Sequence, residues 1–281
     1  MHSLLQSPAG MAGALIIIIV VLIAIFAPLL SPFDPYKLSM TARLKPPSFT
    51  PLKEGQPPHI FGTDSMGRDL FSRTLYGARV SLILGLVASL LGGAVGIVLG
   101  LIAGYFGGKV DTVISWMINV QLAFPFTLLA IFIIAIFGNG LGKLVIVLAW
   151  SVWVNYARIM RAQVLSVKNL EYIQAAETIG ATKTRIMFRH ILPNAISPLI
   201  VVASFSIASA ILQEASLSFL GLGVDPTVAT WGSMLSDGRS YLQTAWWIAT
   251  LPGFALLFTV LGANLFGDWL RDYLDPRLQI Q

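Results

Sequence analysis

Residues 174–194 of the chain read QAAETIGATKTRIMFRHILPN. This stretch is polar, whereas the sequence on either side of it is apolar enough to enter lipid. The whole chain of 281 residues is 56% hydrophobic and only 11% charged, against about 25% charged residues in a typical soluble domain. So few charges cannot cover a soluble protein of this length. The composition therefore indicates an all-α membrane protein in which the quoted stretch lies outside the lipid.

Other features of the composition exclude several kinds of site. The net charge of +5 is scattered along the chain and gives little support to nucleic-acid binding. The absence of cysteine excludes disulfides, thiolate metal sites and thiol catalysis. The histidines at positions 2, 59 and 190 have no ligand-like spacing. We therefore expect no metal site and no catalytic residue in this chain.

Six apolar segments are long enough to cross a bilayer, which requires roughly 20 residues each. They are residues 11–30, 81–105, 113–137, 144–160, 196–222 and 245–265. The first is expected to be a retained span rather than a signal peptide, because no Lys or Arg precedes it and no clear cleavage site follows. Pro125 is expected to kink the third. Six spans place both termini on one side of the membrane, but the 18 Lys and Arg residues divide equally between the two sides and leave the orientation open.

The segment between the first two spans has a different character. Seven of the 15 prolines lie within residues 31–67, which predicts an irregular loop. The following GRDLFSRTLYGARV (67–80) predicts a short interfacial helix. Its apolar face is expected to contain Leu70, Phe71, Leu75 and Val80. Its cationic rim is expected to contain Arg68, Arg73 and Arg79.

Glycines recur at every fourth position of the second span. They are Gly92, Gly96, Gly100 and Gly104. Residues at this spacing share one helix face, and glycine lets a neighbouring backbone approach closely. The pattern predicts a tight contact with another helix and gives no information about a substrate.

The polar connection, residues 161–194, is expected to contain two short helices. Asn169 is a plausible N-cap of the first, which carries Ile173, Ala176 and Ile179. Gly180 can then adopt a left-handed conformation, and Thr182 can cap a second helix that ends near Pro193. The small side chains of Ala175 and Ala176 would admit a partner. The composition alone leaves open whether a partner binds or the connection is a solvated loop.

The quoted stretch resembles the EAA loop of ATP-binding-cassette (ABC) importer permeases. The matching positions are Ala175, Ala176, Gly180, Leu192 and Pro193. Two positions depart from the pattern, since Gln174 replaces the typical Glu and His190 replaces Ile. Three further blocks, FGTDSMGRDLFSRTLYGARVSL (61–82), EASLSFLGLG (214–223) with Trp231-Gly232 after it, and GDWLRDYLDPRL (267–278), are similar to the C-type permease subunit of dipeptide, oligopeptide and nickel importers.

This resemblance implies a type I ABC-importer permease fold in the inner (cytoplasmic) membrane. The EAA loop and both termini would face the cytoplasm. The organisation would be an N-terminal transmembrane helix (1–30), an extracytoplasmic Pro-rich loop with the interfacial helix (31–80), and a five-helix permease core with the coupling loop (81–281).

The resemblance also implies partners. They would be a second homologous permease, two ATPase subunits, an extracytoplasmic substrate-binding protein and membrane lipid, with no nucleic acid. Two near matches to a phosphate-binding loop, GYFGGKV (104–110) and GNGLGKL (138–144), lack the required glycine spacing and the Ser or Thr after Lys. This chain would therefore bind no cofactor, and the ATPase subunits would bind ATP and Mg²⁺. The residues expected to couple to them are Gln174, Ala175, Ala176, Glu177, Gly180, Ala181, Thr182, Lys183, Leu192 and Pro193.

Polar residues within the spans are candidates for the translocation path. They are Asn119, Gln121, Asn155, Gln213, Glu214 and Asn264. Glu214 would either contact a cargo amine or pair with a neighbouring helix and hold the bundle together. For the amides, hydrogen bonding between helices is the alternative.

We therefore expect a non-catalytic permease subunit of an ATP-driven importer that forms half of the path for di- or oligopeptides. The same machine carrying nickel or another small solute is the nearest alternative. A self-sufficient secondary transporter or channel is an alternative of another class. No nucleophile–base or metal constellation supports a membrane enzyme.

Overall fold

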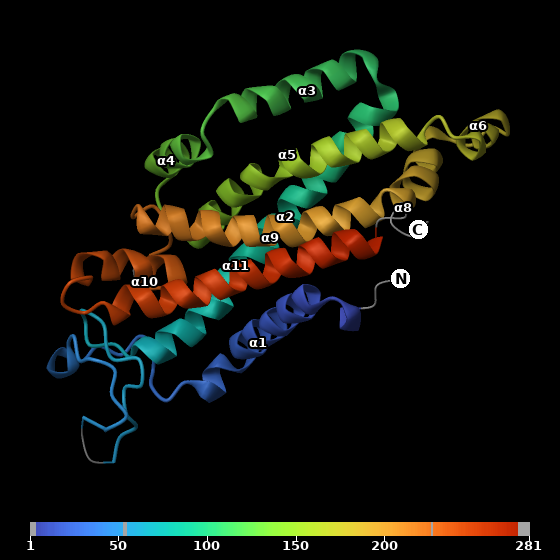
Figure 1. The fold of residues 1–281 in the computed structure, drawn as a ribbon. Coiled ribbons are helices and arrows are strands. Elements are labelled where there is room, and N and C mark those ends of the chain that lie inside the picture. Colours follow the sequence, from blue (N-terminus) through green and yellow to red (C-terminus); the bar gives the residue numbers. More distant parts are fainter. Residues whose placement is uncertain (1–3, 53–54, 226, 275–281) are drawn as a thin grey trace.

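The computed structural model describes residues 4–52, 55–225 and 227–274. Within these ranges the chain is helical apart from its loops, and the only β-pairing is an isolated bridge between Thr63 and Asp69. Figure 1 shows the long helices running side by side as an elongated bundle. This arrangement confirms the all-α class.

Five helices are long and apolar enough to cross a membrane. They are α1 (Pro8–Leu30), α2 (Leu70–Phe106), α5 (Leu141–Val167), α9 (Ile196–Phe219) and α11 (Trp247–Leu274). A sixth candidate consists of α3 (Gly108–Ala123) and α4 (Phe126–Phe137), which meet at 90°. The six expected spans are therefore obtained if this pair counts as one.

The bend between α3 and α4 lies where the sequence predicts a kink. Pro125 has φ −57° and ψ 126°, and Phe124 is also extended, so neither continues the helix. Proline cannot donate the hydrogen bond that would bridge the two segments. The kink is thus a full break in the helix.

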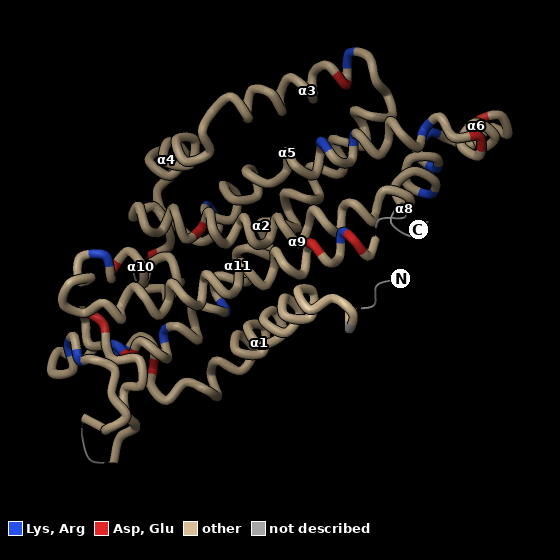
Figure 2. Tube along the Cα trace, in the orientation of Figure 1, with Lys and Arg blue, Asp and Glu red and all other residues tan. Residues whose placement is uncertain are grey.

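The remaining elements are short and lie towards the two ends of the bundle. They are η1 (Leu4–Gln6), η2 (Met40–Ala42), α6 (Glu171–Thr178), α7 (Lys183–Arg185), the π-helix η3 (Ile186–Ile191), α8 (Leu192–Asn194), α10 (Trp231–Gly238) and η4 (Arg239–Tyr241). In Figure 1, α6 and α8 lie at the same end as both chain termini, whereas α10 and the loop before α2 lie at the other. Figure 2 shows that charged residues gather towards these two ends and that α1 carries none along its length.

The glycine-rich face of α2 packs against α5, as its spacing predicts. A Cβ added at Gly92 would lie 2.4 Å from the carbonyl oxygen of Ala149, and one added at Gly96 would lie 2.3 Å from that of Trp153. Real Cβ atoms do not approach a backbone oxygen so closely. The absence of side chains on this face therefore sets the distance between the two helices.

The separate interfacial helix expected at residues 67–80 is a wrong prediction. Helix α2 begins at Leu70, with Asp69 as its N-cap, and continues without a break to Phe106. At about 1.5 Å per residue, its 37 residues span about 55 Å, well beyond the roughly 30 Å hydrocarbon core of a bilayer. Leu70 and Leu75 are buried within the protein rather than facing lipid.

The cationic rim expected for that helix is also largely wrong. Arg68 and Arg73 are buried, and only Arg79 is exposed. Arg68 Nε donates to Asp64 Oδ2 at 2.6 Å, and Arg73 Nε lies 3.5 Å from the same oxygen. Arg68 also reaches Asp237 Oδ2 on α10 at 3.3 Å. These side chains form the acid–arginine cluster, which joins α2 and α10 to the loop between α1 and α2. Because this loop lies at one end of the bundle in Figure 1, we name it the outer loop.

Candidate functional site

The region predicted to couple to a partner folds as one compact unit, residues 171–194, which we name the coupling unit. Helix α6 closes with two backbone hydrogen bonds, from Gly180 N to Glu177 O at 2.9 Å and from Ala181 N to Ala176 O at 3.0 Å. Gly180 has φ +82°. These features form a Schellman motif and confirm the expected left-handed glycine.

The caps of the two helices agree only in part with the sequence analysis. Thr182 accepts a hydrogen bond from Arg185 N at 3.3 Å, which confirms it as the second N-cap. The assignment of Asn169 as the first N-cap is wrong, because α6 begins after Leu170, which provides no side-chain cap. Asn169 instead accepts a bond at its carbonyl oxygen from Gln174 Nε2 at 3.1 Å.

The interior of the coupling unit is apolar. Ile173, Ile186 and Ile191 are fully buried in a cluster that also contains Val164 and Val167 near the end of α5. Burying several large side chains gives the unit a fixed shape. It is therefore rigidly joined to the bundle rather than a solvated coil.

Two further contacts join the coupling unit to the end of α2. The carboxylate of Glu177 lies near the hydroxyl group of Tyr105 and interacts with it electrostatically. Lys183 Nζ lies 5.6 Å from the centre of the Phe106 ring, a distance at which a cation and an aromatic face attract. These contacts connect the coupling unit to the end of α2.

The predicted coupling residues occupy different depths. Those that are exposed are Gln174, Ala175, Glu177, Gly180, Thr182, Lys183 and Pro193. Ala181 and Leu192 are half-buried, and Ala176 is buried at 7% exposure. The expectation that both alanines admit a partner is therefore wrong for Ala176, which faces the interior.

The coupling unit also exposes apolar side chains. Ile179, next to the glycine bend, is 85% exposed, and Phe188 is 50% exposed. The sequence analysis placed Ile179 in the apolar run of the first helix. Large apolar side chains exposed on a protruding polar segment are typical of a contact with another protein.

Three adjoining cavities form a groove along α5 and α9. The first, of about 240 Å³, is lined by Gln121, Trp150, Asn155 and Gln213 among others. Asn155 also lines the second, of about 530 Å³. Ile159 and other residues of the second line the third, of about 680 Å³, which extends to α11. The shared residues show that the three cavities adjoin. We name them together the transport groove, because they include three of the residues expected on the translocation path.

The structure separates the six candidate path residues. Gln121, Asn155 and Gln213 lie together at one end of the transport groove. Asn119 and Asn264 line none of its three cavities. Gln121 also bridges two helices, since its Nε2 donates to Trp150 O and its Oε1 accepts from Trp153 Nε1, both at 2.6 Å. Hydrogen bonding between helices is therefore part of its role.

Glu214 is fully buried and lies away from the groove cavities. Its carboxyl group accepts a hydrogen bond from Ser218 Oγ at 2.7 Å and faces Ser81 Oγ on α2 at 3.5 Å. This placement favours the structural alternative, in which Glu214 ties α9 to α2.

Sequence reasoning missed three polar residues of the groove's middle cavity. Arg158 on α5 and Ser206 and Ser209 on α9 line this cavity. The signal was present, because Asn155, Arg158 and Ala162 follow the three- and four-residue spacing of one helix face. Arg158 lies two residues before the end of the predicted span 144–160 and was not among the candidates for the path.

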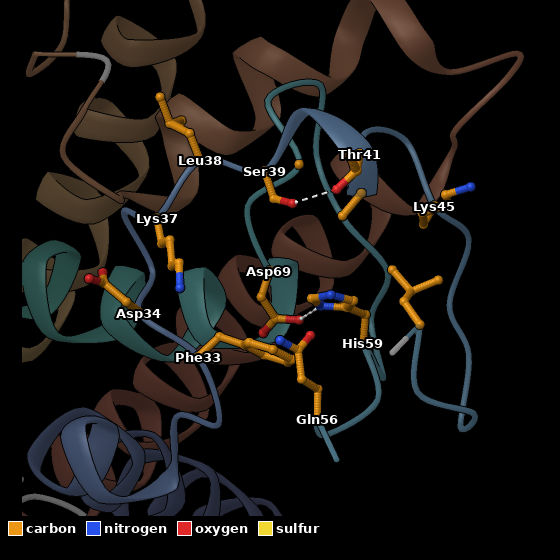
Figure 3. A pocket seen from close by; sticks show the side chains of 13 residues that line it. Phe33, Asp34, Lys37, Leu38, Ser39, Thr41, Lys45, Gln56, His59 and Asp69 are labelled. Carbon is orange, nitrogen blue, oxygen red and sulfur yellow. Dashed lines mark hydrogen bonds and ion pairs between the residues drawn. The ribbon is translucent and has the colours of Figure 1, made fainter. Parts of the chain in front are cut away.

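A separate cavity of about 410 Å³ lies in the outer loop (Figure 3). His59 Nδ1 lies 2.7 Å from Asp69 Oδ1, and the ring of Phe33 stacks on His59 with 4.3 Å between centroids. Because Asp69 also caps α2 through Ser72 N at 2.8 Å, His59 supports the start of that helix. Among the residues described, no group of three or more His, Cys, Asp or Glu could hold a metal ion.

Comparison with known proteins extends over nearly the whole chain. Residues 96–280 match the family described as binding-protein-dependent transport system inner membrane component. Residues 1–47 match the N-terminal TM domain of oligopeptide transport permease C. The dipeptide transport system permease protein DppC of Escherichia coli (strain K12) is 45% identical over 99% of this chain and 92% of that protein. The di/tripeptide transport system permease protein DppC of Pseudomonas aeruginosa (strain UCBPP-PA14) is 43% identical over 99% of this chain and 91% of that protein.

Solved structures support the fold. A chain of the MetNI methionine ABC transporter in an inward-facing conformation superposes with a TM-score of 0.58 at 20% identity, covering 72% of this chain and 96% of that chain. The ABC-importer permease fold is thereby confirmed. In such transporters ATP hydrolysis is carried out by separate ATPase subunits. The chain therefore belongs to the binding-protein-dependent transport system inner membrane components and is a multi-pass permease subunit of an ATP-driven importer.

Proposed function

We propose that this chain is one of two permease subunits of an importer for di- and tripeptides, with both termini and the coupling unit in the cytoplasm. Two ATPase partners bind ATP and Mg²⁺, and an extracytoplasmic protein delivers the peptide. The cargo assignment is supported by the two relatives named for dipeptide and di/tripeptide transport, which match 99% of the chain.

The observation that carries the coupling role is the construction of the unit at residues 171–194. A Schellman motif and a threonine cap fix its two helices, a buried apolar centre joins it to α5, and Ile179 is left 85% exposed. A stiff, partly apolar protrusion transmits force only if another protein grips it. An ATPase subunit fits this requirement, because ABC transporters place hydrolysis in separate chains.

The transport groove supports the presence of a second permease. It runs along α5 and α9, and its three cavities are open rather than enclosed. Its polar side chains, such as Asn155 and Arg158, cannot face lipid without cost. A second permease subunit would supply the opposite wall of the path.

Adjacent alanines allow a matched test of the coupling role. The chain has no cysteine, so Ala175→Cys and Ala176→Cys each create a unique thiol. We expect a short cross-linker in intact membranes of the host to join exposed Ala175→Cys to an ATPase subunit and to leave buried Ala176→Cys largely unreacted. Absence of any ATPase adduct, or labelling of Ala175→Cys by an impermeant reagent added outside the cell, would contradict the proposal.

Uptake assays test the cargo. Deleting this chain should abolish ATP-dependent uptake of labelled dialanine in the host, and restoring it should recover that uptake. Unchanged dialanine uptake combined with lost Ni²⁺ uptake would favour the nickel alternative. Purified chain in liposomes should transport nothing without ATPase subunits, whereas transport driven by an ion gradient would favour a secondary transporter.

A further inference from the structure

The charged side chains that line the transport groove are all positive. Among all residues that line its three cavities, the charged ones are Arg158 and Arg271, and no Asp or Glu is present. The other polar groups are amides and hydroxyls, including Asn155, Ser206 and Gln213. The groove thus presents positive charge and uncharged hydrogen-bonding groups to whatever passes along it.

Arg158 lies deep along α5. It follows Leu141 by 17 residues and precedes Val167 by nine, which places it about 26 Å and about 14 Å from the two ends of the helix. An unpaired charge at such depth is expensive unless it faces water or a partner. Arg158 lies beside Asn155 and Ile159 on the face of α5 that lines the middle cavity, whose volume of about 530 Å³ has room for water or for a bound group.

The neighbouring arginine on α5 shows the contrast. Arg161 donates from its terminal nitrogen to Asp111 Oδ2 on α3 at 2.7 Å. Among the residues that the structure describes, no acidic side chain forms an ion pair with Arg158. One arginine therefore fastens α5 to α3, and the other is exposed in the groove with its hydrogen-bonding capacity free.

We propose that Arg158 binds the terminal carboxylate of the peptide during its passage, an inference that rests on the proposed function. A guanidinium presents a planar pair of N–H donors that matches a carboxylate. Every unmodified di- or tripeptide carries one carboxylate at its end, whatever its side chains. A single arginine can therefore select for the class of cargo without selecting its sequence. A bare divalent cation would instead be repelled by Arg158.

The role of Arg158 can be tested by removing its positive charge and then restoring a charge chemically at the same position. Arg158→Cys in the complete importer, in membranes, is expected to lower uptake of labelled dialanine about tenfold or more, because hydrogen bonds to charged groups are among the stronger ones. Methanethiosulfonate reagents then attach a chosen group to the only thiol of this chain. The aminoethyl reagent, which restores a cation, should recover uptake, whereas the sulfonatoethyl reagent should lower it further.

The controls distinguish the effect of the attached group's charge from the effect of its volume and from the reagent's access to position 158. The neutral hydroxyethyl reagent should give no recovery, and the cysteine-free wild-type chain should be unaffected by all three reagents. Leu165→Cys, which is exposed on α5 but lines none of the groove cavities, should show no dependence on the charge of the reagent. Equal effects of the three reagents at position 158, or no reaction there, would overturn the proposal.

A second comparison tests the carboxylate itself. Uptake by Arg158→Gln is divided by wild-type uptake, separately for dialanine and for dialanine amide, so that any preference of the delivering protein cancels. Dialanine should lose about tenfold more than the amide, and Arg158→Lys, which keeps the charge but not the paired N–H donors, should lose less dialanine uptake than Arg158→Gln. Equal losses would assign Arg158 a structural role. Absence of dialanine uptake by the wild-type importer would contradict the proposed function itself. That result differs from equal losses in the variant, which would contradict only the role of Arg158.

Discussion

At the scale of single residues, Gly180 contributes a backbone conformation to the bend of the coupling unit. The residue has φ +82°, and a Cβ added there would meet nothing within 4 Å. A substitution therefore acts only through the backbone, since left-handed geometry costs an ordinary L-residue roughly 1–2 kcal/mol. The position requires a conformation and makes no side-chain contact.

This distinction yields a prediction for Gly180. Gly180→Val should reduce uptake strongly while the permease still inserts into the membrane, because a β-branched side chain strains the bend. Gly180→Asn, which tolerates the left-handed region, should retain most uptake and serves as the control. Uptake normalised to the amount of membrane-inserted chain measures both. Normal uptake by the valine variant would count against a rigid unit.

Glu214 permits a second prediction, because its role follows from its hydrogen bonds. Glu214→Gln keeps groups that can pair with Ser218 and Ser81, so uptake should change less than threefold. Glu214→Ala leaves the partners unsatisfied and should cost roughly 1–3 kcal/mol of stability. Unfolding in mixed detergent micelles, together with uptake, measures the two effects. A well-folded glutamine variant without uptake would instead give the carboxylate a direct role in transport.

At the scale of helices, the contact between α2 and α5 depends on the missing side chains of α2. Gly96→Ala places a Cβ 2.3 Å from the carbonyl oxygen of Trp153, so the helices must separate. Overpacking of this kind typically costs 1–3 kcal/mol. We expect the midpoint of detergent-induced unfolding to fall by a corresponding amount.

The matched control for that prediction is Gly142→Ala on α5. A Cβ there would meet nothing within 4 Å, and the residue lies inside the first turn of the helix. It should leave stability unchanged or slightly raised, because alanine favours helix more than glycine does. Equal destabilisation by both variants would show that the glycine face of α2 is not a packing surface.

The helices also show which features could be predicted from sequence. Gly180, Thr182 and the glycine face of α2 were predictable, because each depends on residues within a few positions. The acid–arginine cluster was not, because Arg68 is paired with a carboxylate 169 positions away. Without that partner in view, arginines beside an apolar span indicate a membrane surface. Residue spacing alone also did not show that Ala176 would be buried.

The candidate path was predicted only in part, for a related physical reason. Polarity within a span identified Gln121, Asn155 and Gln213, which do gather in the groove. The same criterion selected Glu214, because sequence cannot show which helix face points to a cavity and which to a neighbour. Arg158 escaped attention because the predicted span ended two residues after it.

At the scale of the whole molecule, the acid–arginine cluster holds the outer loop against α2 and α10. Asp64 is 2% exposed and faces both Arg68 and Arg73. Asp64→Asn removes the charge that compensates two buried guanidinium groups, and breaking a buried pair in this way costs about 3–5 kcal/mol. We expect faster proteolysis within residues 31–69 and a lower unfolding midpoint.

Asp225→Asn is the control for the loop prediction. This carboxylate is exposed and contacts only its near neighbour Thr227, to which it is hydrogen-bonded at 2.6 Å. The same change of charge there should alter neither proteolysis of the outer loop nor unfolding. Identical behaviour of the two variants would mean that the cluster contributes nothing to the attachment of the loop.

Helix α2 connects the two ends of the molecule. It starts within the acid–arginine cluster, contains no proline, and finishes at Tyr105 and Phe106 against the coupling unit. A rod about 55 Å long that is clamped at each tip carries a tilt from one tip to the other. In the proposed importer, docking of the delivery protein at one end of α2 and ATP hydrolysis at the other would then be mechanically one event. Loosening the outer clamp should make ATP turnover insensitive to whether a loaded delivery protein has arrived.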